Sequence, residues 1–454
     1  MTKTLQAGAA KVNITPPLTI PYLGYEPRHA FFEGIHDPLY VRALAIDDGL
    51  TQAIILAADA IGFSNEILGS ERNFTAEVRA RIERRTGVPA THIMLTCSHA
   101  HSTPETIHLR RLLDTPAAAP WLETLIDQLT SAAVMAISRR RAHILKIGIG
   151  EVRGLARNRR VLGKHGGVYP IEERPSKDQI ADWGIVDPQV GVLLLEDERG
   201  DSCIVLANFA CHPVTVQVQP LISADFPGAA MALVERNVPG CTVSLFLQGA
   251  CGDLNPARDD SRDFKDVDRY GLMLGGEVLK LVGLLSSPDY PISHPIVAVN
   301  SVVISLPTRD VPARDSVLKT FEEADRKLAM ATTEEERKHF AKERRQAEEA
   351  LILIARSAEP IEAEIQVMRL GDAALVAIPG ELFAELGLEI KRRSIAPYTF
   401  IVCYANGWIG YIPTEKAWGQ GGYEVELGPW TRVGPMAGVL VVEKAIELIR
   451  EAMK

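Results

Sequence analysis

The first half of the chain alternates short apolar segments with longer segments of helical periodicity, and this alternation constrains the fold more than any other feature. The predicted strands are residues 52–58, 91–97, 203–209 and 242–247, and the predicted helices are residues 73–85, 228–236 and 266–285. Strands that alternate with helices favour a layered α/β arrangement in which at least some strands pair in parallel.

The second half has a different pattern. Residues 296–306, 362–368 and 373–378 predict neighbouring strands, the last two joined by a Gly-Asp turn. Residues 315–355 are dense in Glu, Lys, Arg and Ala with apolar positions at helical spacing; they predict a helical hairpin packed on the body, with a free linker as the alternative. We therefore predict an α/β fold of layered mixed β-sheets flanked by helices: one domain over residues 1–454, with a helical hairpin inserted at about residues 312–357.

Composition excludes several classes of protein. Apolar residues make up 46% and charged residues 24% of the chain, which is typical of a folded globular protein. The net charge of -9 does not favour a nucleic-acid partner. The N-terminus lacks the apolar stretch of a secretory signal, and the chain has no apolar run of ~20 residues that could insert into a membrane. The six cysteines are scattered and most lie in apolar, strand-like stretches, which indicates buried, reduced thiols and a cytoplasmic location. They form no CxxC pair, so a Cys-rich metal site is not expected. The sequence leaves the oligomeric state open.

The clearest chemical motif is CSHAHSTP at residues 97–104, which follows a predicted strand. Residues i and i+2 of an extended chain point to the same face, so His99 and His101 can converge on one site. Open α/β sheets also place their ligand crevices at strand ends. The motif therefore predicts a metal or catalytic site, and a pair of hydrogen-bonded loop histidines is the alternative.

A second histidine, His212, also follows a predicted strand. Imidazole is a favoured zinc ligand, and a catalytic zinc usually takes three protein ligands plus water. In the segment QGACGDLNP at residues 248–256, the glycines allow close backbone approach and Asp253 could orient a ligand histidine. The alternative for His212 is a structural role, and the alternative for residues 248–256 is a tight strand-to-loop turn.

Glu381 ends a Pro-Gly-Glu sequence where a predicted strand passes into a predicted helix over residues 382–393. As a ligand it would complete a set of two histidines and one glutamate, a recurrent catalytic zinc combination. Its alternative role is that of a partner for the helix dipole. The segment 404–424 that follows is rich in glycine and aromatic residues, and by spacing alone its tyrosines are packing residues.

Taken in order, these motifs resemble the neutral/alkaline (non-lysosomal) ceramidase family of zinc-dependent amidases. The resemblance covers nearly the whole chain, beginning with residues 7–16 and 34–37 and continuing through Asp59 to the HxHS motif. Matched position by position, it implies four Zn2+ ligands: His99, His212, Glu381 and Tyr411. It further implies that His101 transfers a proton, that Tyr423 polarises the scissile carbonyl, and that Arg159, next to Asn158, adds an oxyanion contact.

Two departures from the family pattern bear on the substrate. Asn255 stands where the family has a serine that helps to hold the substrate, and the chain ends after a predicted helix over residues 437–453, without the C-terminal β-sandwich of secreted ceramidases. The expected function is a zinc-dependent hydrolase that uses metal-activated water to cleave an amide or related acyl bond of a small molecule, and not membrane ceramide. An esterase or lactonase on the same scaffold, or a metal-binding module without catalysis, are the alternatives.

Overall fold

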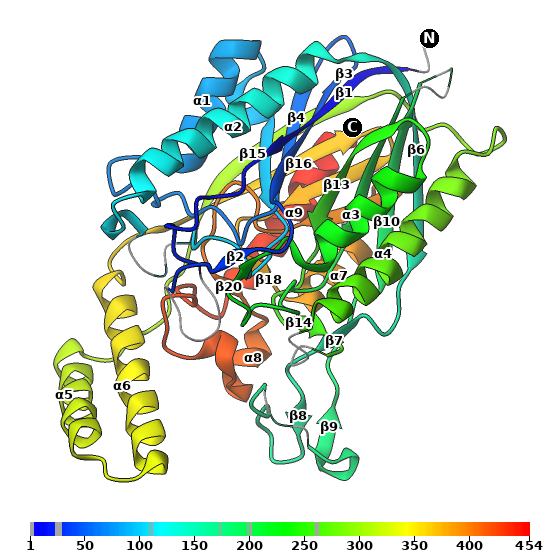
Figure 1. Ribbon diagram of the computed structural model, residues 1–454. Helices are drawn as coiled ribbons and strands as arrows, with labels where there is room; N and C mark the ends of the chain where they lie inside the picture. Colours follow the sequence, from blue (N-terminus) through cyan, green and yellow to red (C-terminus); the bar gives the residue numbers. More distant parts are fainter. Residues whose placement is uncertain are drawn as a thin grey trace.

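A large, curved β-sheet forms the body of the molecule (Figure 1). The computed structural model describes residues 4–22, 30–107, 109, 112–171, 173, 175–197, 199, 202–258 and 263–454. The sheet has eight strands in the order β13-β11-β10-β6-β1-β3-β4-β5. Their bounds are β1 Leu5–Asn13, β3 Tyr40–Asp47, β4 Gln52–Ala58, β5 Ile93–Cys97, β6 Arg141–Glu151, β10 Gln189–Glu196, β11 Cys203–Phe209 and β13 Cys241–Gln248.

The sheet is mixed. β4 pairs with β5 in parallel, and β11 pairs with β13 in parallel, whereas the strands between them pair antiparallel. The prediction of a layered α/β fold with partly parallel pairing is therefore confirmed. The sequence patterns did not single out β1, β3, β6 and β10, which make up the antiparallel centre.

A smaller sheet of four strands packs against one face of the large sheet. Its order is β15-β16-β17-β19, with bounds Val297–Leu306, Ile361–Leu370, Ala373–Ala377 and Tyr398–Val402. β16 and β17 form the predicted hairpin, and Gly371 occupies its turn with φ +61°, a conformation that favours glycine. The inner faces of the two sheets bury a shared apolar core, to which Leu193, Leu375 and Phe400 contribute.

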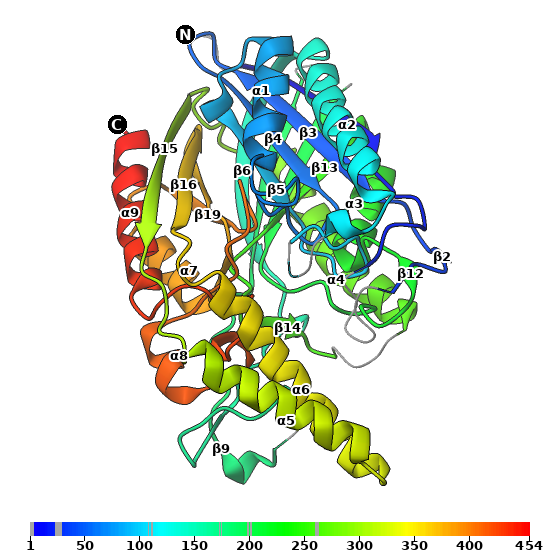
Figure 2. The ribbon, with the colours of Figure 1, turned by 90° about the vertical axis from the view of Figure 1, so that its left-hand side faces the viewer.

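Helices cover the outer faces of both sheets. α1 (Phe74–Thr86), α2 (Ala118–Ser138), α3 (Asp225–Asn237) and α4 (Phe264–Leu285) lie on the large sheet. α7 (Ala384–Arg393) and α9 (Ala437–Ala452) lie by the small one. Figure 2 shows α9 on the opposite side of the sheets from α1 and α2. The layers therefore run helices, large sheet, small sheet, helices.

Local chemistry explains where the predicted and observed helix bounds differ. α1 begins one residue later than predicted because Asn73 is its N-cap, with a side chain that accepts a hydrogen bond from the Ala76 amide at 2.9 Å. α3 begins three residues earlier than predicted, at Asp225, because a proline in the first helical turn removes an amide that needs no partner there. α7 begins at Ala384, so Glu381 precedes the helix instead of lying in its first turn.

The segment between β15 and β16 forms two helices, α5 (Arg314–Met330) and α6 (Glu334–Ala355), which extend away from the sheets (Figure 1). Thr333 caps α6 through a reciprocal pair of hydrogen bonds with Glu336. Only the C-terminal part of α6 buries apolar side chains, among them Ala350 and Leu353. The expected helices are present, but the expectation that the hairpin packs on the body is wrong for most of its length, because α5 and α6 pack mainly against each other. The assignment of the whole chain to one domain stays a prediction.

Short elements complete the structure. The short strands are β2 Gly34–Ile35, β7 Ala156–Asn158, β8 Leu162–Gly163, β9 Ile180–Asp182, β12 Leu221–Ile222, β14 Leu254–Pro256, β18 Glu381–Leu382 and β20 Tyr411–Ile412. The short helices are α8 Glu415–Gln420 and the single turns Ala90–His92, Leu112–Asp114, Lys177–Gln179 and Tyr423–Val425. Among the residues that the structure describes, no helix combines the length and apolar character needed to span a bilayer. All six cysteines are buried, as expected.

Two glycines test the packing of these layers. A Cβ added to Gly8 in β1 would meet the backbone at the end of α2, 2.6 Å from the Arg140 nitrogen. Gly8→Ala is therefore expected to lower the free energy of unfolding by roughly 1–3 kcal/mol. Gly276 in α4 has open space at the same position, and Gly276→Ala is expected to raise stability by about 1 kcal/mol through helix propensity. Urea unfolding of both variants measures the two effects, and equal effects would contradict this packing.

Candidate metal centre

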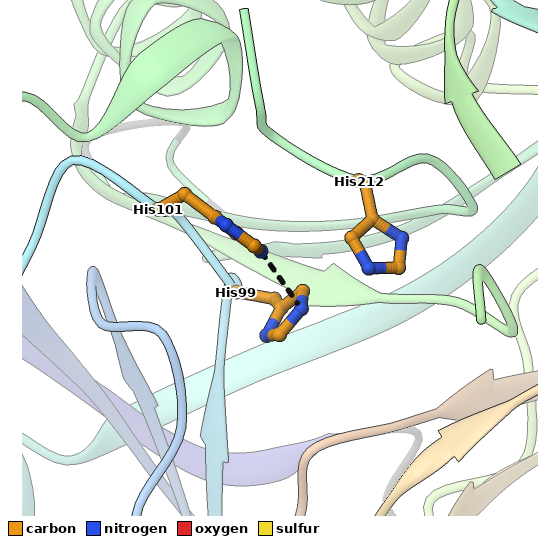
Figure 3. Close-up of side chains that lie close together, drawn as sticks. All are labelled: His99, His101 and His212. Atoms are coloured by element: carbon orange, nitrogen blue, oxygen red, sulfur yellow. Dashed lines mark hydrogen bonds between the residues drawn. The ribbon is translucent and has the colours of Figure 1, made fainter. Parts of the chain in front are cut away.

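Three histidines converge at the ends of two strands of the large sheet. His99 and His101 follow β5, and His212 follows β11 (Figure 3). One ring nitrogen of each lies within 4.8 Å of those of the other two, and the Nε2 atoms of His99 and His101 are 3.2 Å apart. His99 and His212 are fully buried, whereas His101 is half-buried. The expected convergence of His99 and His101 on one site is therefore present, and His212 joins them.

Backbone carbonyls fix the orientation of the two buried histidines. His99 Nδ1 lies 2.5 Å from the carbonyl oxygen of Ile61, and His212 Nδ1 lies 2.6 Å from that of Cys251. A carbonyl oxygen can only accept, so each Nδ1 carries the proton and donates it. In the neutral ring, Nε2 is then left with a free lone pair, which is how metal-binding histidines are commonly held.

The sheet supplies each histidine and its acceptor from adjacent strands. His99 follows β5 and Ile61 follows β4, which is the parallel neighbour of β5. His212 follows β11 and Cys251 follows β13, which is the parallel neighbour of β11. Parallel strands end at the same edge of a sheet, so both pairs meet there without a long loop. The two parallel pairs of the large sheet thus each present one oriented imidazole.

Glu381 faces both imidazoles. Its Oε2 atom lies 3.2 Å from His212 Nε2 and 3.5 Å from His99 Nε2. Glu381 belongs to β18, which pairs in parallel with β20, and its ladder partner is Tyr411. Gly252 allows this approach, because a Cβ there would clash with the Glu381 backbone. The structure therefore brings His99, His212 and Glu381 together from three separate parts of the chain, and the ladder places Tyr411 beside Glu381.

The charges of these groups fit a bound cation. Burial and the nearby Arg159 lower the pKa of His212 to about 4, so its ring is neutral at pH 7. Burial alone would raise the pKa of Glu381, but His99 and His212 hold it well below its ordinary value, so its carboxyl is ionised. A neutral Nε2 and a carboxylate oxygen are both acceptors, and facing each other they repel unless a proton or a metal ion lies between them. A divalent ion with a preference for nitrogen and oxygen ligands satisfies all of them.

Arg159 connects Tyr411 to the surrounding loops. Its guanidinium donates to the Tyr411 hydroxyl oxygen at 2.9 Å, to the Gly252 carbonyl at 2.7 Å, to Asn255 Oδ1 at 3.0 Å and to Glu424 Oε1 at 2.7 Å. Burial raises the pKa of Tyr411 well above its ordinary value, although the positive charge of Arg159 opposes that rise. The expected oxyanion contact of Arg159 thus competes with hydrogen bonds that the guanidinium already makes.

Asp253 has a different partner from the one expected. Its carboxylate accepts from Asn158 Nδ2 at 2.7 Å and from the Ala384 amide at 2.8 Å. The bonds that orient His99 and His212 come from backbone carbonyls instead. Asp253 therefore fixes the loop that carries Arg159 against the start of α7, because Asn158 is the neighbour of Arg159 in the chain.

Tyr423 packs against two aromatic rings. The rings of Tyr411 and Tyr423 meet edge to face with centroids 5.9 Å apart, and Tyr423 stacks on Trp430 at 4.7 Å. The next residue, Glu424, is buried between Arg159 and Arg160, with its carboxylate 2.7 Å and 2.5 Å from the two guanidinium groups. This buried triad ties the turn that carries Tyr423 to the loop that carries Arg159.

Three residues that contact the centre have no counterpart among the site residues predicted from sequence. Gln248, at the end of β13, donates to the carbonyls of Ser98 and Cys211, at 2.8 Å and 2.9 Å, and so joins the two histidine loops. Tyr404 and Trp408 contact Glu381 from the aromatic segment before Tyr411. A polar residue that ends an apolar strand is the only sequence signal for Gln248, and the two aromatic residues fit ordinary packing equally well.

Comparison with known proteins gives consistent results over most of the chain. The model of the neutral/alkaline non-lysosomal ceramidase family, N-terminal part, matches residues 5–262. The neutral ceramidase of Pseudomonas aeruginosa is 22% identical over 504 residues of alignment, which cover 97% of this chain and 72% of that protein.

Solved structures agree at the level of the fold. The crystal structure of neutral ceramidase from Pseudomonas aeruginosa superimposes with a TM-score of 0.72 and 18% identity, covering 98% of this chain and 74% of that one. A structure of ceramidase complexed with C2 gives a TM-score of 0.71 and 17% identity, covering 99% of this chain and 75% of that one. The mixed α/β fold is therefore that of neutral ceramidase, and the chain belongs to the neutral/alkaline non-lysosomal ceramidase family.

Proposed function

We propose that this chain is a zinc-dependent hydrolase that cleaves an amide or related acyl bond, with the ion held by His99, His212, Glu381 and Tyr411. Membership of a hydrolase family supports the reaction class. One observation supports the metal assignment above all. The Nδ1 protons of His99 and His212 are donated to backbone carbonyls, so both Nε2 lone pairs face the Glu381 carboxylate. Two histidines and a glutamate are a recurrent catalytic zinc set.

A bound Zn2+ would supply Lewis acidity and lower the pKa of a water molecule to ≈ 7. Tyr411 supports such an ion because Arg159 donates to its oxygen and favours the phenolate that would bind the metal. Arg159 therefore acts as a positioning residue for Tyr411 and Asn255.

His101 is the proposed proton-transfer residue. It is half-buried, and its Nε2 lies 3.2 Å from His99 Nε2, next to the proposed metal position. Burial and the neighbouring His99 and His212 lower the pKa of His101 well below its ordinary value, so it is neutral and can accept a proton at pH 7. It would take that proton from water and return it to the leaving group.

Tyr423 is the proposed oxyanion donor. Its ring is held between those of Tyr411 and Trp430, and the ion pairs of Glu424 fix its backbone. A positioned hydroxyl of this kind stabilises the charge that develops on the carbonyl oxygen, by roughly 2.7–4 kcal/mol for comparable donors.

The substrate that we propose is a small molecule with an acyl-amide bond. The Pseudomonas aeruginosa relative is named for ceramide, a lipid amide, and that name supports the bond type. Asn255 offers an amide in place of a hydroxyl and is held by Arg159, so the contacts to substrate differ from those of the serine in the family pattern. A screen of acyl amides against esters and lactones with zinc-loaded protein separates the amidase from the esterase or lactonase.

Substitutions separate metal ligands from catalytic residues. His99→Ala is expected to abolish zinc retention and turnover together, because it removes a buried ligand. His101→Ala and Tyr423→Phe are expected to retain one zinc per chain and to lower turnover by 10²–10³-fold. Metal content by mass spectrometry and initial rates measure both effects. A zinc-free His99→Ala variant with full activity would refute the ligand assignment, and loss of zinc from His101→Ala would make His101 a ligand.

The pH dependence of zinc affinity tests whether Tyr411 binds as a phenolate. The raised pKa of Tyr411 means that its phenol is protonated at neutral pH, so binding as a phenolate releases one proton. Deprotonation of Tyr411 should then raise zinc affinity by about tenfold for each pH unit between pH 6 and 8. Because His212, with a pKa of about 4, is already neutral throughout this range, it adds no proton release. Chelator competition on wild type and Tyr411→Phe should show a slope of log affinity against pH that is one unit smaller in the variant; identical slopes would exclude phenolate binding.

A further inference from the structure

Both carboxylate oxygens of Glu381 face aromatic donors from the segment that precedes Tyr411. The indole nitrogen of Trp408 donates to Oε1 at 3.1 Å. The hydroxyl of Tyr404 donates to Oε2 at 3.4 Å. All three side chains are buried, so water does not replace these donors readily.

The direction of the Tyr404 hydrogen bond follows from its neighbours. Tyr404 Oη also lies 3.2 Å from Cys251 Sγ. An ionised carboxylate can only accept, so the Tyr404 proton goes to Glu381 and the thiol proton of Cys251 goes to Tyr404. The backbone carbonyl of the same cysteine accepts from His212 Nδ1. Cys251 therefore links the surroundings of two of the proposed ligands.

Tyr404 contacts a third proposed ligand through its ring. It stacks on the His99 imidazole with centroids 3.9 Å apart and an interplanar angle of 15°. Its backbone has φ +54°, which is a costly conformation for an aromatic residue, and His99 has φ +66°. Such strain persists only where the surrounding structure holds it in place.

The large sheet holds this strained segment. Asn406 Oδ1 accepts from the Leu95 amide at 3.0 Å, and the Asn406 amide donates to the Leu95 carbonyl at 2.7 Å. Thr96 donates to the Cys403 carbonyl at 2.9 Å. Leu95 and Thr96 belong to β5, the strand that leads into His99, so the segment carrying Tyr404 and Trp408 is fixed to the strand that positions the first ligand.

We propose that Tyr404 and Trp408 are positioning residues that restrict Glu381 to binding the metal through Oε2 alone and thereby set the affinity of the centre. Trp408 occupies Oε1 and leaves Oε2 facing the two Nε2 atoms. Tyr404 fixes the Oε2 atom and the plane of the His99 ring together. This inference rests on the proposed metal centre, and it assigns to the aromatic segment a role beyond packing.

Two substitutions remove one donor each: the first keeps the ring, and the second also shortens the indole to a phenyl ring, which the control at Trp121 matches. Tyr404→Phe removes the hydroxyl and keeps the stack on His99, and Trp408→Phe removes the indole N–H. Each is expected to weaken Zn2+ binding by roughly 10–100-fold, the usual effect of losing a hydrogen bond to a metal ligand. Chelator competition at fixed pH measures the dissociation constant. Matched controls are Tyr398→Phe in β19 and Trp121→Phe in α2, which should bind zinc as wild type does.

Substitution with Co2+ adds a readout that a merely structural role would not change. Trp408→Phe frees Oε1 to bind the ion as well, so the visible absorption of its Co2+ form should fall in intensity, as it does when coordination number rises. Thermal unfolding of the metal-free variants shows whether each is folded. If one of the two single variants does not fold, the zinc affinity of the other tests the proposal. In the double variant, the two losses should not add, because both donors act on one carboxylate.

The outcomes distinguish this inference from the proposed function. Wild-type protein that retains no zinc would refute the metal centre itself. Wild-type protein that retains zinc, together with single variants whose dissociation constants and Co2+ spectra match it, would overturn the positioning role alone.

Discussion

Two hydrogen bonds from imidazole to backbone determine what this centre can do. The carbonyls of Ile61 and Cys251 hold the Nδ1 protons of His99 and His212, so the opposite nitrogens are left as ligands. If either carbonyl were displaced, the ring could take its other tautomer and its Nε2 would carry a proton. Each carbonyl is placed by the strand parallel to the one that carries its histidine. The chemistry of the site therefore depends on where the parallel pairs of the sheet end.

The two parallel pairs lie at opposite ends of the strand order, yet their histidines meet. Gln248, from the end of β13, reaches the carbonyl of Ser98, which follows β5. The residue after β19 connects the same two strands, since the Cys403 amide donates to the Gln248 carbonyl at 2.9 Å and its carbonyl accepts from Thr96. The end of β19 in the small sheet thus connects β13 and β5, the two edge strands of the large sheet. The chain then continues directly into the segment of Tyr404, Trp408 and Tyr411.

Sequence patterns predicted those parts of the fold and site that depend on local periodicity. The strand over residues 52–58 was predicted with its observed bounds, because a fully buried strand is a continuous apolar run, and the hairpin helices were predicted from their periodicity. The histidines were found because they end such runs. The antiparallel centre of the sheet was missed, since β1 and β6 have apolar patterns interrupted by polar and small residues.

Contacts between distant segments could not be predicted in this way. Glu381 lies in a two-residue strand paired with Tyr411, and a strand so short has no periodicity of its own. The acceptors of the histidine protons are backbone carbonyls, which leave no trace in residue identity. Tyr404 and Trp408 look like packing residues in the sequence, and only the position of the Glu381 carboxylate gives them another role. The resemblance to ceramidases assigned Tyr411 and Tyr423, which spacing alone could not.

Diffraction from zinc-soaked crystals, recorded on both sides of the zinc absorption edge, tests the central claim most directly. We expect one anomalous peak per chain at ≈ 2.0–2.2 Å from His99 Nε2, His212 Nε2, Glu381 Oε2 and the Tyr411 oxygen. A peak elsewhere in the molecule, or none at this position in protein soaked with excess zinc, would contradict it.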